Sequence, residues 1–329
     1  MRRRELLTLL SLAAVAWPLA VRGQQRDRMR RIAIVMPFAK GDNEGEARIH
    51  AFKQELAKLG WTDGSNIQFD ERWPADNMDM VRSHAASVVA SNPDVIVTFG
   101  GRVVPVFTRL TRSIPMVLPY ASDPVGVGYA QSLAHPGGNV TGFTSFELSM
   151  LGKSLEILKQ IAPAIVRVAL IYNPDNPNTA YYRRISHAAS APLALEVIDL
   201  PIHTLADIDR AVTNLADRGN SGIFFLPDLT TNALRDDVVG LVGQRRVPAI
   251  YSEPFFVKLG GLVFYGPDRM EGFRGAAGYV DRILRGEKPG DLPFQQPTKY
   301  ELIINRTAAK ALGLELSPTL LALADEVIE

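Results

Sequence analysis

Ser113-Ile114-Pro115-Met116-Val117 returns later in the chain, in altered form, as Arg246-Val247-Pro248-Ala249-Ile250. Each copy is a proline between short apolar runs, and each follows a series of apolar runs that alternate with amphipathic segments. Apolar runs of about four to eight residues indicate buried strands, and apolar residues at helical spacing indicate amphipathic helices. Strands and helices in alternation are typical of a parallel sheet with helices on both faces. We therefore expect two similar α/β units in tandem.

The pattern also predicts where the elements of the two units lie. In the first unit, strands are expected at 32–36, 66–73, 94–99 and 115–119, with helices at 47–59, 80–90 and 103–110. In the second, a first helix at 148–161 precedes strands at 166–172, 195–200, 221–226 and 248–252 and helices at 180–191, 205–218 and 234–244. The stretch 137–145 is interpreted as a turn and crossing between the units.

The tail departs from this alternation. It predicts strands at 261–265 and 301–305, an amphipathic helix at 270–285, and helical segments at 307–312 and 320–327. A tail this long after two complete units suggests that the chain crosses back between two lobes. We expect an N-terminal lobe at 31–145 plus about 268–290, and a C-terminal lobe at 146–267 plus about 291–329.

The first residues have the layout of an export signal. Arg2-Arg3-Arg4 is followed by a mostly apolar run to Ala20, and Val21-Arg22-Gly23 offers a cleavage site before Gln24. The apolar run is shorter than the roughly 20 residues of a membrane span. The sequence predicts that 1–23 is removed on export, by the general secretory route or, because Arg3-Arg4 precedes hydrophobic residues, by the twin-arginine route.

Composition limits the class of protein. The 329 residues include no cysteine, which excludes disulfides, thiolate metal sites and a lipidated N-terminal cysteine. Segment 1–23 carries four arginines and one glutamate, so without it the formal charge falls from +1 to about −2. A nearly neutral chain has no electrostatic footprint for nucleic acid. We expect a monomeric periplasmic protein of a Gram-negative cell, without a lipid anchor and with no membrane span in the mature chain.

Ligands of open parallel sheets bind beyond the carboxyl ends of the strands. In this chain those ends carry Pro37-Phe38, Gly100-Gly101-Arg102, Tyr120-Ala121-Ser122-Asp123, Tyr172-Asn173-Pro174, Pro227-Asp228 and Tyr251-Ser252-Glu253. If the two units face each other, these tips line one cleft. The mixture of aromatic, hydroxyl, amide and carboxylate groups suits a small polar or zwitterionic ligand with an apolar body.

Two pairings within this cleft are expected. Gly100-Gly101 leads into a helix and offers backbone N–H groups to a ligand carboxylate. Asp228 follows an apolar strand and is placed to pair with a ligand ammonium. The alternative is that Asp228 only caps a helix beginning near Thr231.

The motifs of common enzyme classes are missing. The sequence contains neither G-x-S-x-G nor a P-loop, and no two of its five histidines stand at metal-ligand spacing. We expect no metal and no cofactor. Asp123, Asp228 and Glu253 remain possible general acid/base groups, so a periplasmic enzyme stays an alternative.

Several segments together resemble the ABC-transporter substrate-binding family that includes the tryptophan/tyrosine-type binding proteins. They are 122–126 (SDPVG), 133–142 (LAHPGGNVTG), 265–268 (YGPD), 296–305 (QPTKYELIIN), 308–314 (AAKALGL) and 324–328 (ADEVI). The resemblance implies a type I periplasmic-binding fold, in which two Rossmann-like lobes joined by a hinge close on a ligand. It also implies a membrane permease as partner.

The resemblance also implies binding positions at the strand tip after Thr98, at the turn 122–123, at 141–144, at 173–176, at Asp228 and at Tyr251. With the strand tips, the candidate ligand-binding residues are Phe38, Thr98, Gly100, Gly101, Arg102, Ser122, Asp123, Thr141, Thr144, Asn173, Asn176, Asp228, Tyr251 and Glu253. Relatives usually have a small hydroxyl residue and alanines where this chain has 100–104. If Arg102 points into the cleft, it favours a ligand with an extra negative charge.

The sequence thus predicts a periplasmic solute-binding protein of an ABC importer. The expected ligand is an aromatic or other amino acid, or an aromatic acid, captured by hinge closure. A sensor that presents its closed form to a membrane receptor remains an alternative.

Overall fold

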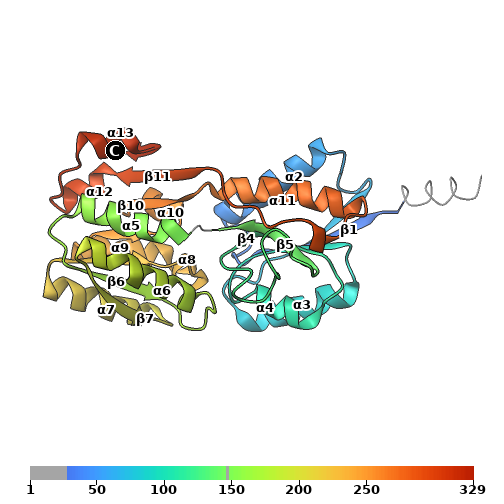
Figure 1. The fold of residues 1–329 in the computed structure, drawn as a ribbon, viewed down its shortest axis with the longest axis horizontal. Coiled ribbons are helices and arrows are strands. Elements are labelled where there is room, and N and C mark those ends of the chain that lie inside the picture. The colour runs from blue at the N-terminus through green and yellow to red at the C-terminus, as the bar shows by residue number, and fades with distance from the viewer. Residues whose placement is uncertain (1–27, 146–147) are drawn as a thin grey trace, which may run out of the picture.

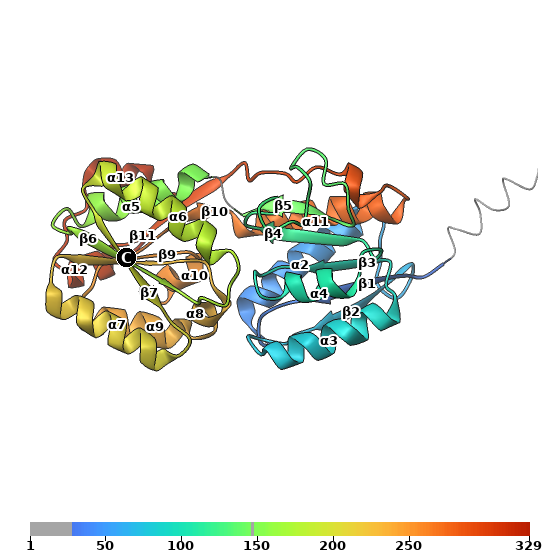
Figure 2. The same ribbon diagram turned by 60° about the horizontal axis from the view of Figure 1, so that its bottom comes forward.

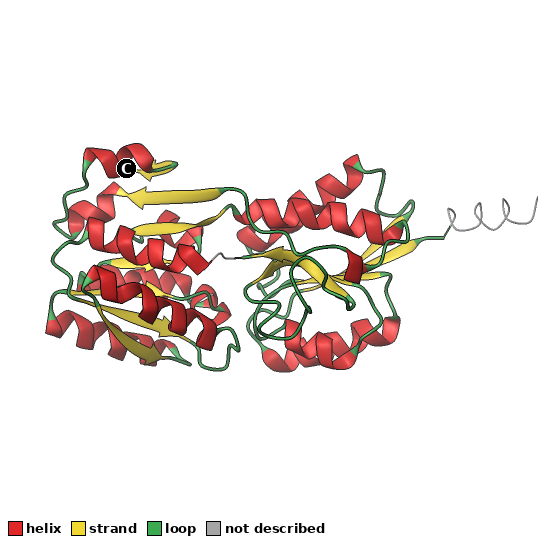
Figure 3. Ribbon diagram, in the orientation of Figure 1, coloured by secondary structure: helices red, strands yellow, loops and turns green. Residues whose placement is uncertain are grey.

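The computed structural model describes residues 28–145 and 148–329, and the predicted export signal lies outside them. It forms two α/β lobes side by side, each a twisted sheet between layers of helices (Figures 1 and 3). The two predicted α/β units correspond to these lobes, and the two-lobed α/β fold is confirmed.

The first lobe is built on a five-stranded parallel sheet with the order β2-β1-β3-β4-β5. Its elements are β1 (Arg30–Val35), α2 (Asn43–Lys58), β2 (Ile67–Arg72), α3 (Met78–Ser91), β3 (Val95–Thr98), α4 (Val104–Leu110), β4 (Met116–Ala121), β5 (Val140–Thr144), α11 (Arg269–Leu284) and the 3-10 turn η2 (Pro289–Asp291). Successive residues of β1 alternate between two cores, because neighbouring side chains of a strand point to opposite faces. Ile32 and Ile34 pack with α2 and α11, whereas Ala33 and Val35 pack with α3 and α4.

The second lobe contains a seven-stranded sheet with the order β12-β11-β10-β9-β8-β6-β7, in which only the β10–β11 pair is antiparallel. Its first elements are α5 (Leu148–Ile161), β6 (Arg167–Tyr172), α6 (Thr179–Ser190), η1 (Ala191–Leu193), β7 (Glu196–Pro201), α7 (Leu205–Arg218), β8 (Ser221–Phe225), α8 (Leu229–Ala233), α9 (Arg235–Arg245) and β9 (Ala249–Tyr251). They are followed by α10 (Pro254–Lys258), β10 (Val263–Pro267) and, after α11, by β11 (Tyr300–Asn305), α12 (Arg306–Ala311), α13 (Pro318–Leu323) and β12 (Glu326–Ile328). The turned view of Figure 2 shows α5 and α6 on one side of this sheet and α7 and α9 on the other.

The tail crosses between the lobes twice. Helix α11 leaves the second lobe after β10 and lies beside α2 in the first, where Phe273 and Val280 are buried (Figure 1). Leu292 and Phe294 are also buried in the first lobe, and the amide of Gln295 donates a hydrogen bond to the Gly142 carbonyl. The crossing back therefore comes after Gln295, later than the expected boundary near 291, because apolar residues beyond α11 complete the first core.

Two of the predicted segments have another secondary structure in the protein, and the short helices α8 and α10 were not predicted. The stretch interpreted as a crossing contains β5, which pairs with β4 at the edge of the first sheet. Gly142 breaks the apolar pattern of this strand, and a Cβ there would lie 2.0 Å from the Leu118 carbonyl oxygen, so the close approach of the two strands requires glycine. In the tail, Glu326–Ile328 is a strand beside β11 and not the end of a helix.

Candidate ligand-binding cleft between the lobes

A cavity lies between the lobes at the carboxyl ends of the parallel strands, where ligands of such sheets bind. The first lobe contributes the segments after β3 and β4, and the second contributes the segments after β6, β8 and β9. The cavity is lined by Phe99, Gly100, Gly101, Arg102, Val104, Leu118, Tyr120, Ala121, Ser122, Tyr129, Ser145, Asn176, Asn178, Tyr182, Pro227, Asp228, Leu229, Asn232, Glu253 and Arg269.

Half of the candidate residues line this cavity. They are Gly100, Gly101, Arg102, Ser122, Asn176, Asp228 and Glu253. They come from both lobes, so the expectation that the two sets of strand tips face each other is met for this group.

Three other candidates are used inside the lobes. The Thr98 hydroxyl donates to a backbone carbonyl of β1, and the Thr141 hydroxyl donates to the Leu292 carbonyl in the tail. Tyr251 is stacked among phenylalanines in the core of the second lobe. All three side chains are buried away from the cavity, because each belongs to a strand and points to a covered face of its sheet.

The remaining four candidates also lie outside the lining. The Phe38 ring packs against the Arg48 guanidinium, and the Asp123 carboxylate accepts a hydrogen bond from an amide of its own turn. Thr144 borders a different hollow beside the tail crossing. The Asn173 side-chain amide donates a hydrogen bond to the Thr230 hydroxyl and so contacts α8.

Asp228 both lines the cavity and caps a helix. It is 5% exposed, lines the cavity, and caps α8 by accepting a hydrogen bond of 2.8 Å from the Thr230 amide. Burial raises the pKa of its carboxyl to about 6. Among the ion pairs of residues 28–145 and 148–329, none includes Asp228. Arg102 lies near enough to lower this pKa, but an ionised Asp228 is a buried charge with no cationic side chain of the described residues within ion-pair distance.

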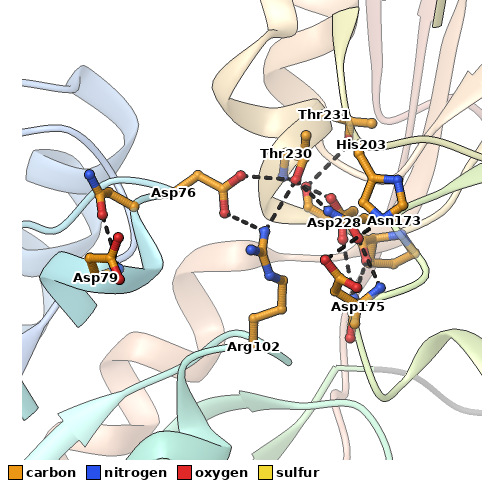
Figure 4. Close-up of polar contacts among 12 residues, drawn as sticks. Asp76, Asp79, Arg102, Asn173, Asp175, His203, Asp228, Thr230 and Thr231 are labelled. Atoms are coloured by element: carbon orange, nitrogen blue, oxygen red, sulfur yellow. Dashed lines mark hydrogen bonds and ion pairs between the residues drawn. The ribbon is translucent and has the colours of Figure 1, made fainter. Parts of the chain in front are cut away.

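Arg102 has a carboxylate partner of its own. Figure 4 shows Asp76 in contact with Arg102, also of the first lobe, and with Thr230 of the second lobe. The Arg102 guanidinium donates to Asp76 at 2.9 Å, and the Thr230 hydroxyl donates to the other Asp76 oxygen at 2.9 Å. Burial raises the pKa of Asp76, and these two hydrogen bonds oppose the rise. Because its charge is already paired, Arg102 gives no reason to expect an extra negative charge on the ligand.

A second charged cluster joins the lobes through Glu253. Arg48 of α2, 1% exposed, donates to Glu253 at 2.8 Å, and Arg269 at the start of α11 lies 3.3 Å from the other Glu253 oxygen. The Arg48 guanidinium also lies over the Phe38 and Tyr120 rings. Two guanidinium groups hold Glu253, which leaves it paired and poorly placed to take a proton from a substrate.

These pairings leave the cleft electrically balanced. The pair Arg102–Asp76 is neutral, and the cluster of Arg48, Arg269 and Glu253 carries one excess positive charge. An ionised Asp228 supplies one negative charge, which offsets this excess. A cleft with separated opposite charges and no net charge is complementary to a zwitterion.

Sequence reasoning missed several lining residues. Phe99 and Tyr120 form an edge-to-face aromatic pair with ring centroids 5.8 Å apart, and Tyr120 lies on a strand tip that had been noted. Arg269 starts a helix after β10, a position that the same strand-tip rule would have found. Tyr182 and Asn232 lie on helices of the second lobe, and nothing in their local sequence distinguishes them.

Two other kinds of site are absent from residues 28–145 and 148–329. No group of three or more histidine, aspartate or glutamate side chains there could hold a metal ion. In the same part of the chain, no helix is long and apolar enough to span a membrane.

The chain is similar to known proteins along most of its length. The family model of the ABC transporter substrate-binding proteins matches residues 32–328. A tyrosine-binding protein of Clostridioides difficile is 28% identical over 267 residues, which are 80% of this chain and 76% of that protein.

Solved structures agree with the fold. A conserved domain protein of Vibrio cholerae matches with a TM-score of 0.82 at 25% identity, over 91% of this chain and all of that one. An ABC domain from Streptococcus pneumonia in complex with L-Trp matches with a TM-score of 0.84 at 21% identity, over the same shares.

Proposed function

Because this chain belongs to the family of ABC transporter substrate-binding proteins, we propose that its cleft captures an aromatic L-amino acid for an ABC importer. The tyrosine named for one relative and the L-Trp bound in one structural neighbour support this ligand class. The predicted export signal supports a periplasmic location, and the family supports a membrane permease as the partner that receives the ligand.

The observation that carries the proposal is the buried carboxylate of Asp228. A buried charge is costly unless an opposite charge or several hydrogen bonds compensate it. Asp228 has one short hydrogen bond, from the Thr230 amide, and a weak one of 3.5 Å from Asn176. A ligand ammonium would supply the missing positive charge.

The rest of an amino acid fits the remaining groups. Its carboxylate would face the excess positive charge of the Glu253 cluster, where Arg269 lines the cavity, and the backbone of Gly100-Gly101. Helix α4 behind these glycines is short, and the amides of Val103 and Val104 already donate to the Gly100 carbonyl. The guanidinium is therefore the stronger partner. The aromatic pair Phe99 and Tyr120 would contact the side chain.

Hinge closure would couple binding to transport. The lobes touch directly, through Arg235 and Asp42 at 2.6 Å and through Leu229, which packs with residues of the first lobe. The chain passes between the lobes after β5, after β10 and before β11, so three segments can act as a hinge. A ligand that contacts both lobes binds the closed form better and shifts the equilibrium toward it.

A thermal-shift comparison of ligand analogues tests this proposal. At a concentration about 100 times the Kd, a ligand adds about 2.7 kcal/mol to the free energy of unfolding. We expect L-tryptophan or L-tyrosine to raise the melting temperature. The same compounds without the amino group, indole-3-propionate and 3-(4-hydroxyphenyl)propionate, should not. Equal shifts with and without the amino group would contradict the pairing with Asp228, and no shift with any of them would contradict the ligand class.

A further inference from the structure

Asn232 lines the cleft and carries a buried hydrogen-bond acceptor that has no donor among the described residues. Its side chain is 9% exposed and lines the cavity. Its Oδ1 atom is buried and receives no hydrogen bond from any residue in the described part of the chain. A buried acceptor left unpaired costs free energy, so this atom is expected to gain a partner when the cleft is filled.

The hydrogen-bond partner of Asn232 would be a different group from the ligand ammonium, because Asn232 and Asp228 lie at different positions along α8. Asn232 lies one turn along α8 from Asp228, and its amide donates to the Asp228 carbonyl at 3.2 Å. One turn of helix rises about 5.4 Å. The Asp228 carboxylate is held at the start of the helix by the Thr230 amide. The two side chains thus occupy separate positions on α8, which leaves Asn232 to a second polar group of the same ligand.

We propose that Asn232 determines specificity by accepting a hydrogen bond from the aromatic side chain of the ligand. The inference rests on the proposed function and deepens it, because it selects a phenol or an indole over a ring without a donor. A ligand such as phenylalanine leaves Oδ1 unpaired in a closed cleft. Sites built around a buried polar group reject ligands that lack its partner more strongly than they reject small changes in size.

The test compares ligands that differ only in the ring donor. Wild-type protein is titrated in a calorimeter with L-tyrosine, L-tryptophan, L-phenylalanine and L-3-benzothienylalanine, in which sulfur replaces the indole N–H. We expect the better of L-tyrosine and L-tryptophan to bind at least about tenfold more tightly than its analogue without the donor, as one lost hydrogen bond implies. This comparison does not depend on the folding of a variant.

The Asn232→Leu variant then assigns the preference to this side chain, since it removes the acceptor and keeps a similar volume. The preference for a ring donor should disappear, through weaker binding of the donor ligand and unchanged or tighter binding of phenylalanine. Asn305→Ala is the matched control, because Asn305 is a buried asparagine that caps α12 far from the cleft. That control should melt earlier and keep the preference.

The outcomes separate this inference from the proposed function. Wild-type protein that binds phenylalanine and the donor ligands equally well overturns the role of Asn232 alone. An equal loss of affinity for all ligands in Asn232→Leu also overturns it, because Asn232 would then hold the ammonium or only the fold. If no aromatic amino acid binds the wild-type protein, both the inference and the proposed function are wrong.

Discussion

Replacing Asp228 by asparagine should stabilise the empty protein and strongly weaken binding of the amino acid. Asparagine is as good a helix cap as aspartate, so the hydrogen bond from the Thr230 amide can persist. What the Asp228→Asn substitution removes is the buried negative charge and, with it, the partner of the ligand ammonium. The two effects therefore have opposite signs on stability and on affinity.

The size of the stabilisation follows from the pKa of the Asp228 carboxyl, which burial raises from 3.8 to about 6. Each pKa unit corresponds to about 1.4 kcal/mol, so the ionised side chain costs the folded protein about 3 kcal/mol at neutral pH. Because its pKa is higher in the folded than in the unfolded state, Asp228 stays protonated in the folded protein at pH values where it is already ionised in the unfolded chain. The free energy of unfolding therefore falls as the pH rises from about 3.8 to about 6. The gain in Asp228→Asn should thus be about 3 kcal/mol at pH 7.5 and about half of that at pH 5.

Denaturant unfolding at pH 7.5 and pH 5 measures this gain, and calorimetric titration measures affinity. Breaking a buried charge pair typically costs about 3–5 kcal/mol, so affinity should fall at least about 100-fold. Asp123→Asn is the matched control, because Asp123 is a carboxylate of a neighbouring turn that does not line the cleft. A variant that unfolds more easily than the wild type and still binds would show that Asp228 is only a helix cap, and the reasoning would be refuted.

Three further results are expected. Affinity for the amino acid should fall about fivefold between pH 6 and pH 5, because protonation of Asp228, whose pKa is about 6, removes the charge that pairs with the ammonium. A titration series with constant affinity across this range would contradict the pairing. Gly101→Val should prevent the ligand from making the protein more compact in small-angle scattering, since a Cβ at 101 would lie 2.1 Å from the Asn176 side-chain oxygen of the other lobe. Gly138→Ala is the control, because Gly138 has open space around it and this variant should still become compact. If Gly101→Val also became compact with ligand, this geometry of closure would be excluded. Protein recovered from a periplasmic fraction should begin within a few residues of Gln24, and an uncut N-terminus on cytoplasmic protein would disprove export.

The sequence predicted the layers of the fold because its apolar runs record burial directly. Strand tips such as Gly100 and Asp228 could be placed in the cleft for the same reason, since parallel strands end at one edge of a sheet. The rule failed for Thr98 and Tyr251, each the last residue of its strand, because a strand side chain there still points to one face of the sheet and is buried in the lobe.

Other features of the cleft depend on contacts between distant segments. Arg48 and Glu253 are 205 positions apart, and nothing near either residue indicates that they meet. The same holds for Asp76, which neutralises Arg102 and so changes what that arginine implies about the ligand. Pattern and spacing give the strand tips, but the charge balance of a cleft between lobes requires the three-dimensional pairing.

A crystal structure of the protein grown with L-tryptophan or L-tyrosine at pH 7.5 tests the central claim most directly. The account predicts the amino acid between the lobes, with its nitrogen within hydrogen-bonding distance of the Asp228 carboxylate and its carboxylate toward Arg269 and the Gly100-Gly101 backbone. A ligand bound elsewhere, or bound in the cleft with its amino group turned away from Asp228, would contradict it.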